Sequence, residues 1–287
     1  MIGVFDSGVG GLCAYERLKE LLPNEELIYL KDTENAPYGT KTRSEVLSLT
    51  KKNVRTLREL GASHILIACC TASGLWSELT DEEKSISTPI IFPAAAEAVK
   101  AAREAKAKND KSRPISRSQD PESPTKNRAD TEAQTASPTI RRPYNSSVSP
   151  SLSGKGIDKE IGSDGGLVAV ISTELTAKNH TFKKAIEELD PAISVCEIGA
   201  QMLVSLVELG ARDGILFPRE SALLDSICKD IKASGASALI LGCTHFSHLK
   251  EEFKARLGEI KIIDTARLGA EWLAKKCKQE FTKLGQK

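Results

Sequence analysis

Short apolar runs alternate with amphipathic stretches along most of the chain, and this alternation constrains the fold more than any other feature. The intervening stretches repeat apolar residues at helical spacing, and Ala94–Ala107 has a strong helix composition. The runs are too short for helices and most are rich in Ile, Leu and Val, so they predict strands. Such alternation is typical of the α/β class, in which helices cover both faces of parallel sheets. The predicted strands are Ile2–Phe5, Leu27–Leu30, Ile65–Ala68, Ile90–Phe92, Leu167–Ile171, Ile193–Cys196, Ala238–Leu241 and Ile260–Ile263.

The chain also repeats itself. Gly61–Cys69 reads against Gly235–Cys243, and a second match pairs Val4–Ser7 with Val170–Thr173. Two similar, doubly wound α/β domains with parallel-rich sheets would explain both matches. Ligands bind beyond the carboxyl ends of the strands in such sheets, so domains that face each other would share a site in a central cleft. The expected domains are residues 1–92 with 264–287, and residues 93–105 with 165–263.

Residues 106–164 interrupt this pattern with a polar segment. The segment holds six of the 12 prolines and 11 serines, and its few large apolar residues follow no period. It cannot bury enough apolar surface to offset the entropy of ordering it, so we expect a disordered insert. Such a segment is more often a solvated insertion than a binding or regulatory tail.

Charge and apolar content argue against several function classes. The 287 residues carry a formal net charge of +1, without the basic excess typical of nucleic-acid or acidic-membrane binding. The longest unbroken apolar run, Ile65–Cys70, is far shorter than the roughly 20 residues of a membrane-spanning helix. The first residues lack the basic and apolar regions of a secretory signal, so we expect a cytoplasmic protein. The odd count of seven cysteines agrees with free thiols rather than a disulfide framework.

Two cysteines, Cys69 and Cys243, each follow the carboxyl end of a predicted buried strand. In facing domains, both thiols would line one cleft from opposite sides. Such a pair suits a racemase, because one group removes a proton from one face of a carbon and the other delivers a proton to the opposite face. A thiol has a pKa of about 8.5, so a modest shift yields a useful thiolate. The alternative is that both are small buried apolar residues, as most free cysteines are; the repeat favours the acid/base pair.

Polar residues follow each of these thiols. Thr71 comes shortly after Cys69, and Thr244 and His245 come directly after Cys243. A hydroxyl beside a helix N-terminus can bind a carboxylate. His245 can favour the Cys243 thiolate by charge or hydrogen bonding, or it is a structural histidine that caps a turn.

A zinc site is a further interpretation of this region. Cys243, His245 and His248 are close in sequence. Their spacing is neither CxxC nor HExxH, and no fourth ligand is evident, so we expect no metal.

Two loops are rich in turn residues. Asp6–Gly11 places glycines between a strand and a helix, where backbone can approach a ligand. Their spacing is not GxGxxG, which argues against a dinucleotide and favours a small anion or ammonium site at Asp6 and Ser7. Pro37–Gly39 reads as a turn, either a plain loop or part of the site.

Five segments together resemble the bacterial glutamate racemases of the aspartate/glutamate racemase family. The resemblance covers nearly all of the chain outside the insert. It implies two pseudo-symmetric α/β domains and an isomerase that interconverts L- and D-glutamate, with glutamate as its small-molecule partner. It also implies that no cofactor is needed, that D-glutamate is supplied for peptidoglycan, and that a homodimer can form. The segments are Ile2–Leu12, Pro37–Lys41, the residues around Cys69, Leu241–Phe246 and Asp264–Ala266.

The resemblance implies roles for single residues as well. Cys69 would deprotonate D-glutamate and Cys243 would deprotonate L-glutamate. Asp6 and His245 resemble the residues that assist the two thiols, and Glu208 resembles a family glutamate near the cleft. The implied substrate contacts are Asp6, Ser7, Tyr38, Gly39, Cys70, Thr71, Thr244 and His245.

The chain departs from the family pattern in two places. Cys70 replaces an asparagine, and Gly199–Gln201 stands where the family tends to have Cys-Pro. An amide hydrogen-bonds well and a thiol only weakly, and a lost buried hydrogen bond costs about 1–3 kcal/mol. Three hypotheses follow: an active glutamate racemase, which both intact cysteine motifs favour; a catalytically impaired glutamate-binding or regulatory relative; and a racemase for aspartate or another acidic amino acid.

Overall fold

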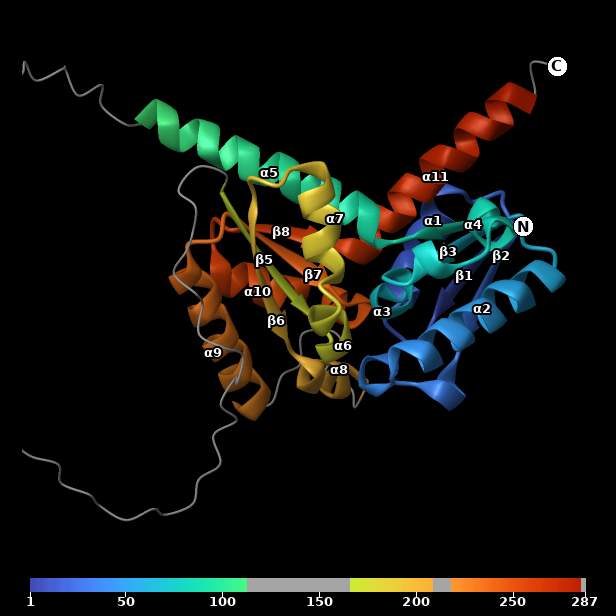
Figure 1. Ribbon diagram of the computed structural model, residues 1–287, viewed down its shortest axis with the longest axis horizontal. Helices are drawn as coiled ribbons and strands as arrows, with labels where there is room; N and C mark the ends of the chain where they lie inside the picture. The colour runs from blue at the N-terminus through green and yellow to red at the C-terminus, as the bar shows by residue number, and fades with distance from the viewer. Residues whose placement is uncertain (113–165, 209–217, 285–287) are drawn as a thin grey trace, which may run out of the picture.

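The computed structural model describes residues 1–112, 166–208 and 218–284. Within these ranges the strands are β1 (Ile2–Asp6), β2 (Leu27–Lys31), β3 (His64–Ile67), β4 (Ser87–Pro89), β5 (Leu167–Ser172), β6 (Ser194–Gly199), β7 (Ala238–Gly242) and β8 (Lys261–Asp264). They form two parallel sheets, with order β2-β1-β3-β4 in the first and β6-β5-β7-β8 in the second (Figure 1). Both sheets thus have the same order and direction, which confirms the predicted α/β fold with two similar halves.

The internal repeat falls on equivalent strands of the two sheets. Gly61–Cys69 contains β3 and Gly235–Cys243 contains β7, and each strand pairs with the first strand of its own sheet. Strand order reverses between β1 and β3, and again between β5 and β7. Ligands bind beyond the carboxyl ends of strands at such switch points, so the fold offers two equivalent binding edges.

Every predicted run except Ile90–Phe92 overlaps a strand. That prediction is wrong, because β4 is Ser87–Pro89 and a helix begins at Ile91. Ile90 and Ile91 are buried at this junction, whereas β4 lies at a sheet edge, where a proline is tolerated. The apolar run therefore indicates that these residues are buried, and it does not indicate a strand.

Helices cover both faces of each sheet (Figure 1). The faces turned toward the other half carry α1 (Leu12–Leu21), α5 (Ile91–Ser112), α7 (Thr181–Leu189) and α11 (Thr265–Leu284). The outer face of the first sheet carries α2 (Arg43–Glu59), and that of the second carries α8 (Gln201–Glu208), α9 (Pro218–Ser234) and α10 (Lys250–Leu257). The short helices are α3 (Cys70–Ser73), α4 (Asp81–Ile86), α6 (Glu174–Lys178) and the 3-10 turns η1 (Thr33–Asn35), η2 (Tyr38–Thr40), η3 (Trp76–Glu78) and η4 (Thr244–Leu249).

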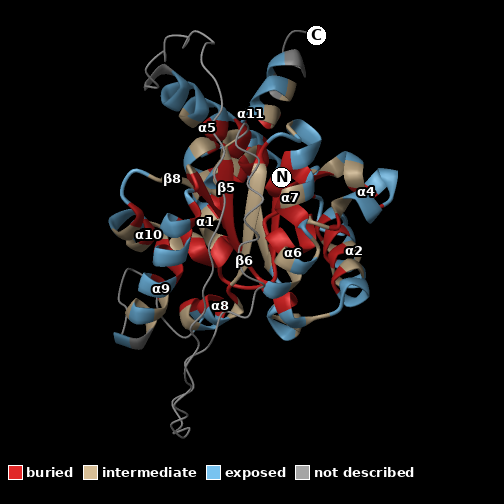
Figure 2. Cartoon of the chain, turned by 60° about the vertical axis from the view of Figure 1, so that its left-hand side comes forward, coloured by how far each residue is buried: buried red, intermediate tan, exposed pale blue. Residues whose placement is uncertain are grey.

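One apolar cluster joins the two sheets. It contains Val4 of β1 and Ile240 of β7, packed together with residues of α5 and α11. Neighbouring positions such as Phe5 and Leu241 face the outer clusters instead, as strand alternation requires. Figure 2 shows buried strands in the interior, the half-buried strand β6 beside them, and the exposed faces of the helices outside. Because burying a large apolar side chain contributes about 1.5–3 kcal/mol, this shared core holds the two sheets in a defined relation.

Helix α5 corrects one boundary of the predicted insert. The helix continues to Ser112, so residues 106–112 belong to it rather than to a disordered segment. The reason is that the preceding turns, from Ala94 to Ala102, pack into the shared cluster and extend a helix whose composition stays favourable. Residues 113–164 of the predicted insert lie outside the described residues, and the domain boundaries stay a prediction.

None of the described helices is long and apolar enough to cross a bilayer. The two longest, α5 and α11, alternate buried apolar residues with exposed charged ones, as helices on a globular core do.

Candidate active site

Four strand ends meet where the two sheets face each other. The first sheet contributes the residues after β1 and β3, and the second contributes those after β5 and β7. Helices α3 and α6, which follow β3 and β5, lie against each other between the sheets (Figure 1). Hydrogen bonds cross this junction: among them, the Thr244 hydroxyl donates to Asp6 Oδ2 over 2.9 Å, and the hydroxyls of Thr71 and Thr173 are 3.1 Å apart. The fold therefore brings the predicted residues of both halves into one buried place.

Cys69 lies at the β3 side of this junction. Its Sγ is 3.5 Å from the Ser7 hydroxyl, and the residue is only 5% exposed. Burial and the nearby Asp6 carboxylate raise the pKa of Cys69 to about 12. Burial also raises the pKa of Asp6, while the charge on His245 and hydrogen bonds from Gly8 N and Thr244 oppose that rise. This side of the site is thus short of positive charge and suits a bound cation.

Cys243 lies on the β7 side, where it contacts a histidine. Its Sγ is 3.5 Å from His245 Nδ1, and His245 Nε2 is 2.6 Å from Glu208 Oε1. Burial lowers the pKa of His245, but Cys243 and Glu208 outweigh it and raise that pKa to about 10. The hydrogen bond from His245 lowers the pKa of Glu208 to about 2. A thiol, an imidazolium and a carboxylate therefore form one chain, with the cation between the Cys243 sulfur and the Glu208 carboxylate.

The glycine-rich loop after β1 makes room for this chain. A Cβ on Gly8 would lie 2.5 Å from Glu208 Oε1, and one on Gly10 would lie 2.5 Å from the backbone nitrogen of His245. Val9 N donates a hydrogen bond to Glu208 Oε1 over 3.3 Å. The glycines thus permit close approach to backbone and side chains of the other half, rather than only to a ligand as their pattern suggested.

Tyr38 and Gly39 lie on η2, beside the junction. The Tyr38 hydroxyl donates to Asp32 Oδ2 over 2.5 Å and accepts from Asn53 Nδ2 over 3.0 Å. Burial and Asp32 raise the pKa of Tyr38, so this hydroxyl stays neutral. Its one proton is already donated to Asp32. A Cβ on Gly39 would lie 2.7 Å from Cβ of Thr173. The Tyr38 ring packs in the apolar core with Phe5 and its hydroxyl is already paired, so its contact with substrate stays a prediction.

Three threonine hydroxyls form a buried cluster at the β5 side. Thr71 lies 3.1 Å from both Thr173 and Thr176, which are 2.8 Å from each other. Sequence analysis missed Thr173 and Thr176. The signal was present, because the match of Val170–Thr173 with Val4–Ser7 puts Thr173 at the position of Ser7. Each hydroxyl can donate one hydrogen bond, so together they can bind a carboxylate.

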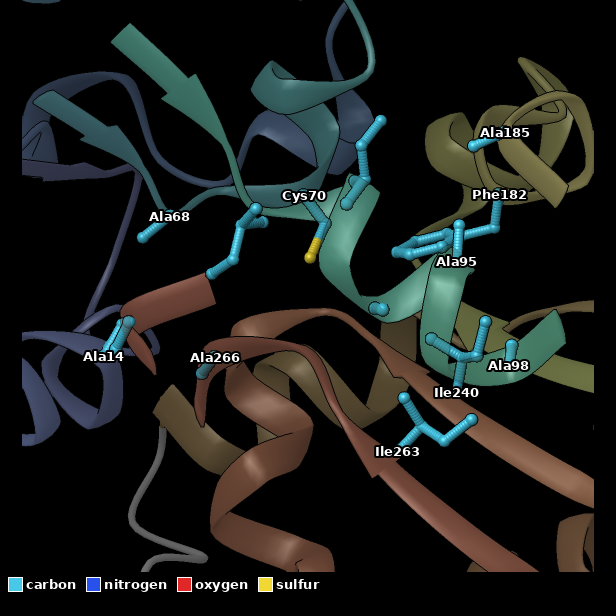
Figure 3. Packing of buried hydrophobic residues seen from close by; sticks show 14 of the residues in the cluster. Ala14, Ala68, Cys70, Ala95, Ala98, Phe182, Ala185, Ile240, Ile263 and Ala266 are labelled. Carbon is cyan, nitrogen blue, oxygen red and sulfur yellow. The ribbon is translucent and has the colours of Figure 1, made fainter. Parts of the chain in front are cut away.

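Cys70 borders both the polar groups of the site and the apolar core, and its thiol is in hydrogen-bond contact with the backbone of Thr244. It is 3% exposed and belongs to the apolar cluster that joins the sheets. Figure 3 shows its sulfur directed into that cluster, with Ala68, Ala95 and Ala266 around it. Burial raises its pKa well above the usual value. Its contact with substrate stays a prediction, and the surroundings of its sulfur combine this apolar cluster with the backbone of Thr244.

The residues considered for zinc do not assemble into a metal site. His248 Nε2 lies 3.6 Å from the sulfur of Cys13 on α1. Across residues 1–112, 166–208 and 218–284, no three His, Cys, Asp or Glu side chains are grouped so that they could hold a metal ion. All seven cysteines lie in these ranges and all are free.

Comparisons with known proteins point to one family. The model of the Asp/Glu/Hydantoin racemase family matches residues 158–273. The glutamate racemase of Lactobacillus acidophilus is 27% identical over 273 residues, which is 94% of this chain and 78% of the relative. A glutamate racemase isoform from Bacillus anthracis has a similar structure, with a TM-score of 0.68 at 23% identity, covering 98% of this chain and 82% of that one. The glutamate racemase of Thermus thermophilus, solved with β-chloro-D-alanine, has a TM-score of 0.57 at 25% identity, covering 97% and 80%.

Proposed function

Because the chain belongs to the aspartate/glutamate racemase family, we propose that it is a glutamate racemase that works through Cys69 and Cys243 without a cofactor. The observation that carries this proposal is the placement of the two thiols. They follow the equivalent strands β3 and β7 and lie in one buried site made from both halves. The names of the relatives support glutamate as the substrate.

In the proposed reaction, one cysteine acts as a thiolate and the other as a thiol. The thiolate takes the proton from the α-carbon, and the electron pair of the broken C–H bond stays on the substrate as a carbanion. The other thiol then donates its proton to the opposite face of that carbon. The enantiomer forms, and the two cysteines have exchanged protonation states. Cys69 begins the reaction of D-glutamate and Cys243 that of L-glutamate.

The positive charge of the substrate ammonium group explains how binding of an amino acid activates Cys69. With the site closed, burial and Asp6 hold the Cys69 thiol protonated at neutral pH. A substrate ammonium group beside Asp6 neutralises that carboxylate and favours the thiolate. On the other side, the Cys243 sulfur lies 3.5 Å from His245, whose pKa is raised to about 10, so a positive charge is already in place there. The two sides therefore differ before substrate binds.

The hydroxyl cluster of Thr71, Thr173 and Thr176 is the proposed place for a substrate carboxylate. Its three hydroxyls are buried and uncharged, and they can turn their donors toward an anion. Ser7, Gly39 and Thr244 border the same junction. All of these groups are buried in the closed form, so the halves must separate slightly for substrate to enter.

Racemisation of L-glutamate in deuterium oxide without added cofactor tests this function. Loss of optical rotation together with deuterium at the α-carbon supports a proton-transfer racemase. Binding of glutamate without turnover would refute the proposal and favour a catalytically impaired relative. Turnover of aspartate alone would show that the protein is a racemase for aspartate rather than glutamate.

Cys69→Ala and Cys243→Ala test the division of labour. Both variants should lose racemisation, because only one face of the α-carbon keeps its base. Cys69→Ala should still exchange the α-hydrogen of L-glutamate, and Cys243→Ala that of D-glutamate. Full racemisation in either variant would exclude the two-base mechanism. Circular dichroism and the melting temperature of each variant report whether the fold is kept.

The cellular role follows from the reaction. We place the enzyme in the cytoplasm, where it supplies D-glutamate for peptidoglycan. Loss of the gene in its host should then be corrected by external D-glutamate, and growth of the null strain without it would contradict the role. A homodimer belongs to the same proposal, and sedimentation velocity measures it directly.

A further inference from the structure

Gln201, the first residue of α8, carries an amide without a partner. Its Oε1 and Nε2 are both shielded from solvent and have no hydrogen-bond partner within the described ranges. A primary amide can donate two hydrogen bonds and accept two. Buried side-chain polar groups are nearly always paired, and an unpaired one lowers stability. This amide therefore calls for a functional explanation.

The amide lies at the junction of the two halves. A methyl group on Gly39 would overlap Oε1 of Gln201 and Cβ of Thr173 alike. Thr173 is a member of the buried hydroxyl cluster, so the amide and the cluster share one neighbourhood. Gln201 comes from the second half and Gly39 from the first, so the amide adjoins the interface that must open for substrate.

Helix α8 connects this place with the imidazole side of the site. Its last residue, Glu208, contacts His245 at 2.6 Å, and its first residue is Gln201. At about 1.5 Å per residue, the two ends are about 10 Å apart. One short helix thus carries a charged group at the thiol–imidazole side and a neutral amide beside the hydroxyls.

We propose that the Gln201 amide binds the side-chain carboxylate of the substrate and selects its length. The inference rests on the proposed function, which puts the α-carbon between Cys69 and Cys243. The carboxylates of Asp6 and Glu208 disfavour a second anion near the thiols, whereas the amide Nε2 and the threonine hydroxyls offer neutral donors. When the α-carbon lies between the thiols and the substrate side chain is long enough to reach the amide, its carboxylate accepts a hydrogen bond from the unpartnered Nε2–H. A shorter acidic side chain leaves it unpaired, and that difference gives specificity.

Gln201→Leu is the decisive variant, because it keeps similar volume and removes the amide. We expect its KM for glutamate to rise about tenfold and its kcat to change less than about twofold, as for one lost hydrogen bond to a charged group. The ratio of kcat/KM for glutamate to that for aspartate should fall by about the same factor. The melting temperature should stay or rise, since an unpaired buried amide is gone. A merely structural glutamine would give the opposite: a lower melting temperature with an unchanged substrate ratio.

Three comparisons complete the test. Gln201→Met is the second apolar variant if Leu does not fold, and Gln201→Glu should raise KM further because it places a negative charge beside the substrate carboxylate. Met202→Leu, at an exposed neighbouring position, is the matched control and should change nothing. An unchanged KM and an unchanged substrate ratio in both apolar variants would overturn the inference.

A calorimetric titration separates this inference from the proposed function. If the wild-type protein does not racemise glutamate, the function fails, and the dissociation constants of D- and L-glutamate then decide about Gln201. Binding about tenfold tighter to wild type than to Gln201→Leu supports the inference. Equal binding to both, or no binding to wild type, overturns it.

Discussion

The contact between Glu208 and His245 makes a quantitative prediction about catalysis. Glu208→Gln keeps the shape and hydrogen-bonding capacity of the side chain and removes its charge. The charge matters because the pKa of His245, raised to about 10, depends in part on Glu208. The variant should therefore release the His245 proton at lower pH and leave a neutral imidazole beside the Cys243 sulfur.

The size of the effect follows from geometry. His245 Nε2 and Glu208 Oε1 are 2.6 Å apart, and the Glu208 side chain is 34% exposed. A unit-charge pair at that distance in water attracts by about 1.6 kcal/mol, and the partial exposure of Glu208 makes this screened value the appropriate lower limit. Since about 1.4 kcal/mol corresponds to a tenfold change in a proton equilibrium, the pKa of His245 should fall from about 10 to about 9 or below.

Two measurements read this change. The imidazole signals of the four histidines can be followed by NMR as pH is raised, which gives the midpoint for His245 directly. The pH profile of kcat/KM reports the same group, and its alkaline limb should move to lower pH by about one. The enantiomers have equal free energy, so kcat/KM must stay equal in the two directions, and an inequality would reveal a faulty assay.

Glu197→Gln is the matched control. Glu197 Oε2 lies 2.6 Å from Nδ1 of His180, the same separation, but the side chain of that histidine is 58% exposed. This control should leave the profile of kcat/KM in place. If Glu208→Gln also leaves both the profile and the His245 midpoint unchanged, the argument that Glu208 sustains the imidazolium is refuted.

Three further predictions concern stability. The folded pKa of His245 exceeds the unfolded value of about 6.5, so the stability from its proton is complete below about pH 6.5 and is lost as pH rises through about 10; His245→Gln should flatten urea-denaturation stability across that window, and an unchanged slope would contradict it. Asn53→Ala removes the donor to Tyr38 and Asp32 and should lower the free energy of unfolding by about 1–3 kcal/mol; no loss would show that these bonds contribute nothing. Replacing residues 113–164 by a short flexible linker should preserve the melting temperature, because the buried residues of α5 end at Ala102; a clear drop would show that the segment packs.

Local patterns accounted for most of the fold. The spacing and type of the apolar residues predicted the strands correctly, because a buried parallel strand is a short run of large apolar residues. This holds for β1, β3, β5 and β7. The prediction is wrong at Ile90–Phe92, because a buried helix start and a buried strand look the same in sequence. Helix α5 also continues past its predicted end, because the composition of its last turns does not show that earlier turns anchor it.

The candidate site divides in a similar way. Cys69 and Cys243 could be singled out because a repeat 174 residues apart placed a thiol after both strands, and the structure brings both strand ends together. Thr173 carried the same kind of signal and went unused. Gln201 was noted only as a departure from a pattern, because an unpaired buried amide exists only once its neighbours are in place.

By itself the sequence determined the α/β class, the likeness of the two halves and the two thiols. These depend on residue type and spacing within a few turns of chain, so they can be read locally. Only the tertiary structure decided that Glu208 contacts His245, that Thr244 donates to Asp6, and that the Cys70 sulfur lies in the shared apolar core. The partners in those hydrogen bonds are 37 and 238 positions apart in the chain. The packing of the two sheets sets such contacts, and no local pattern contains them.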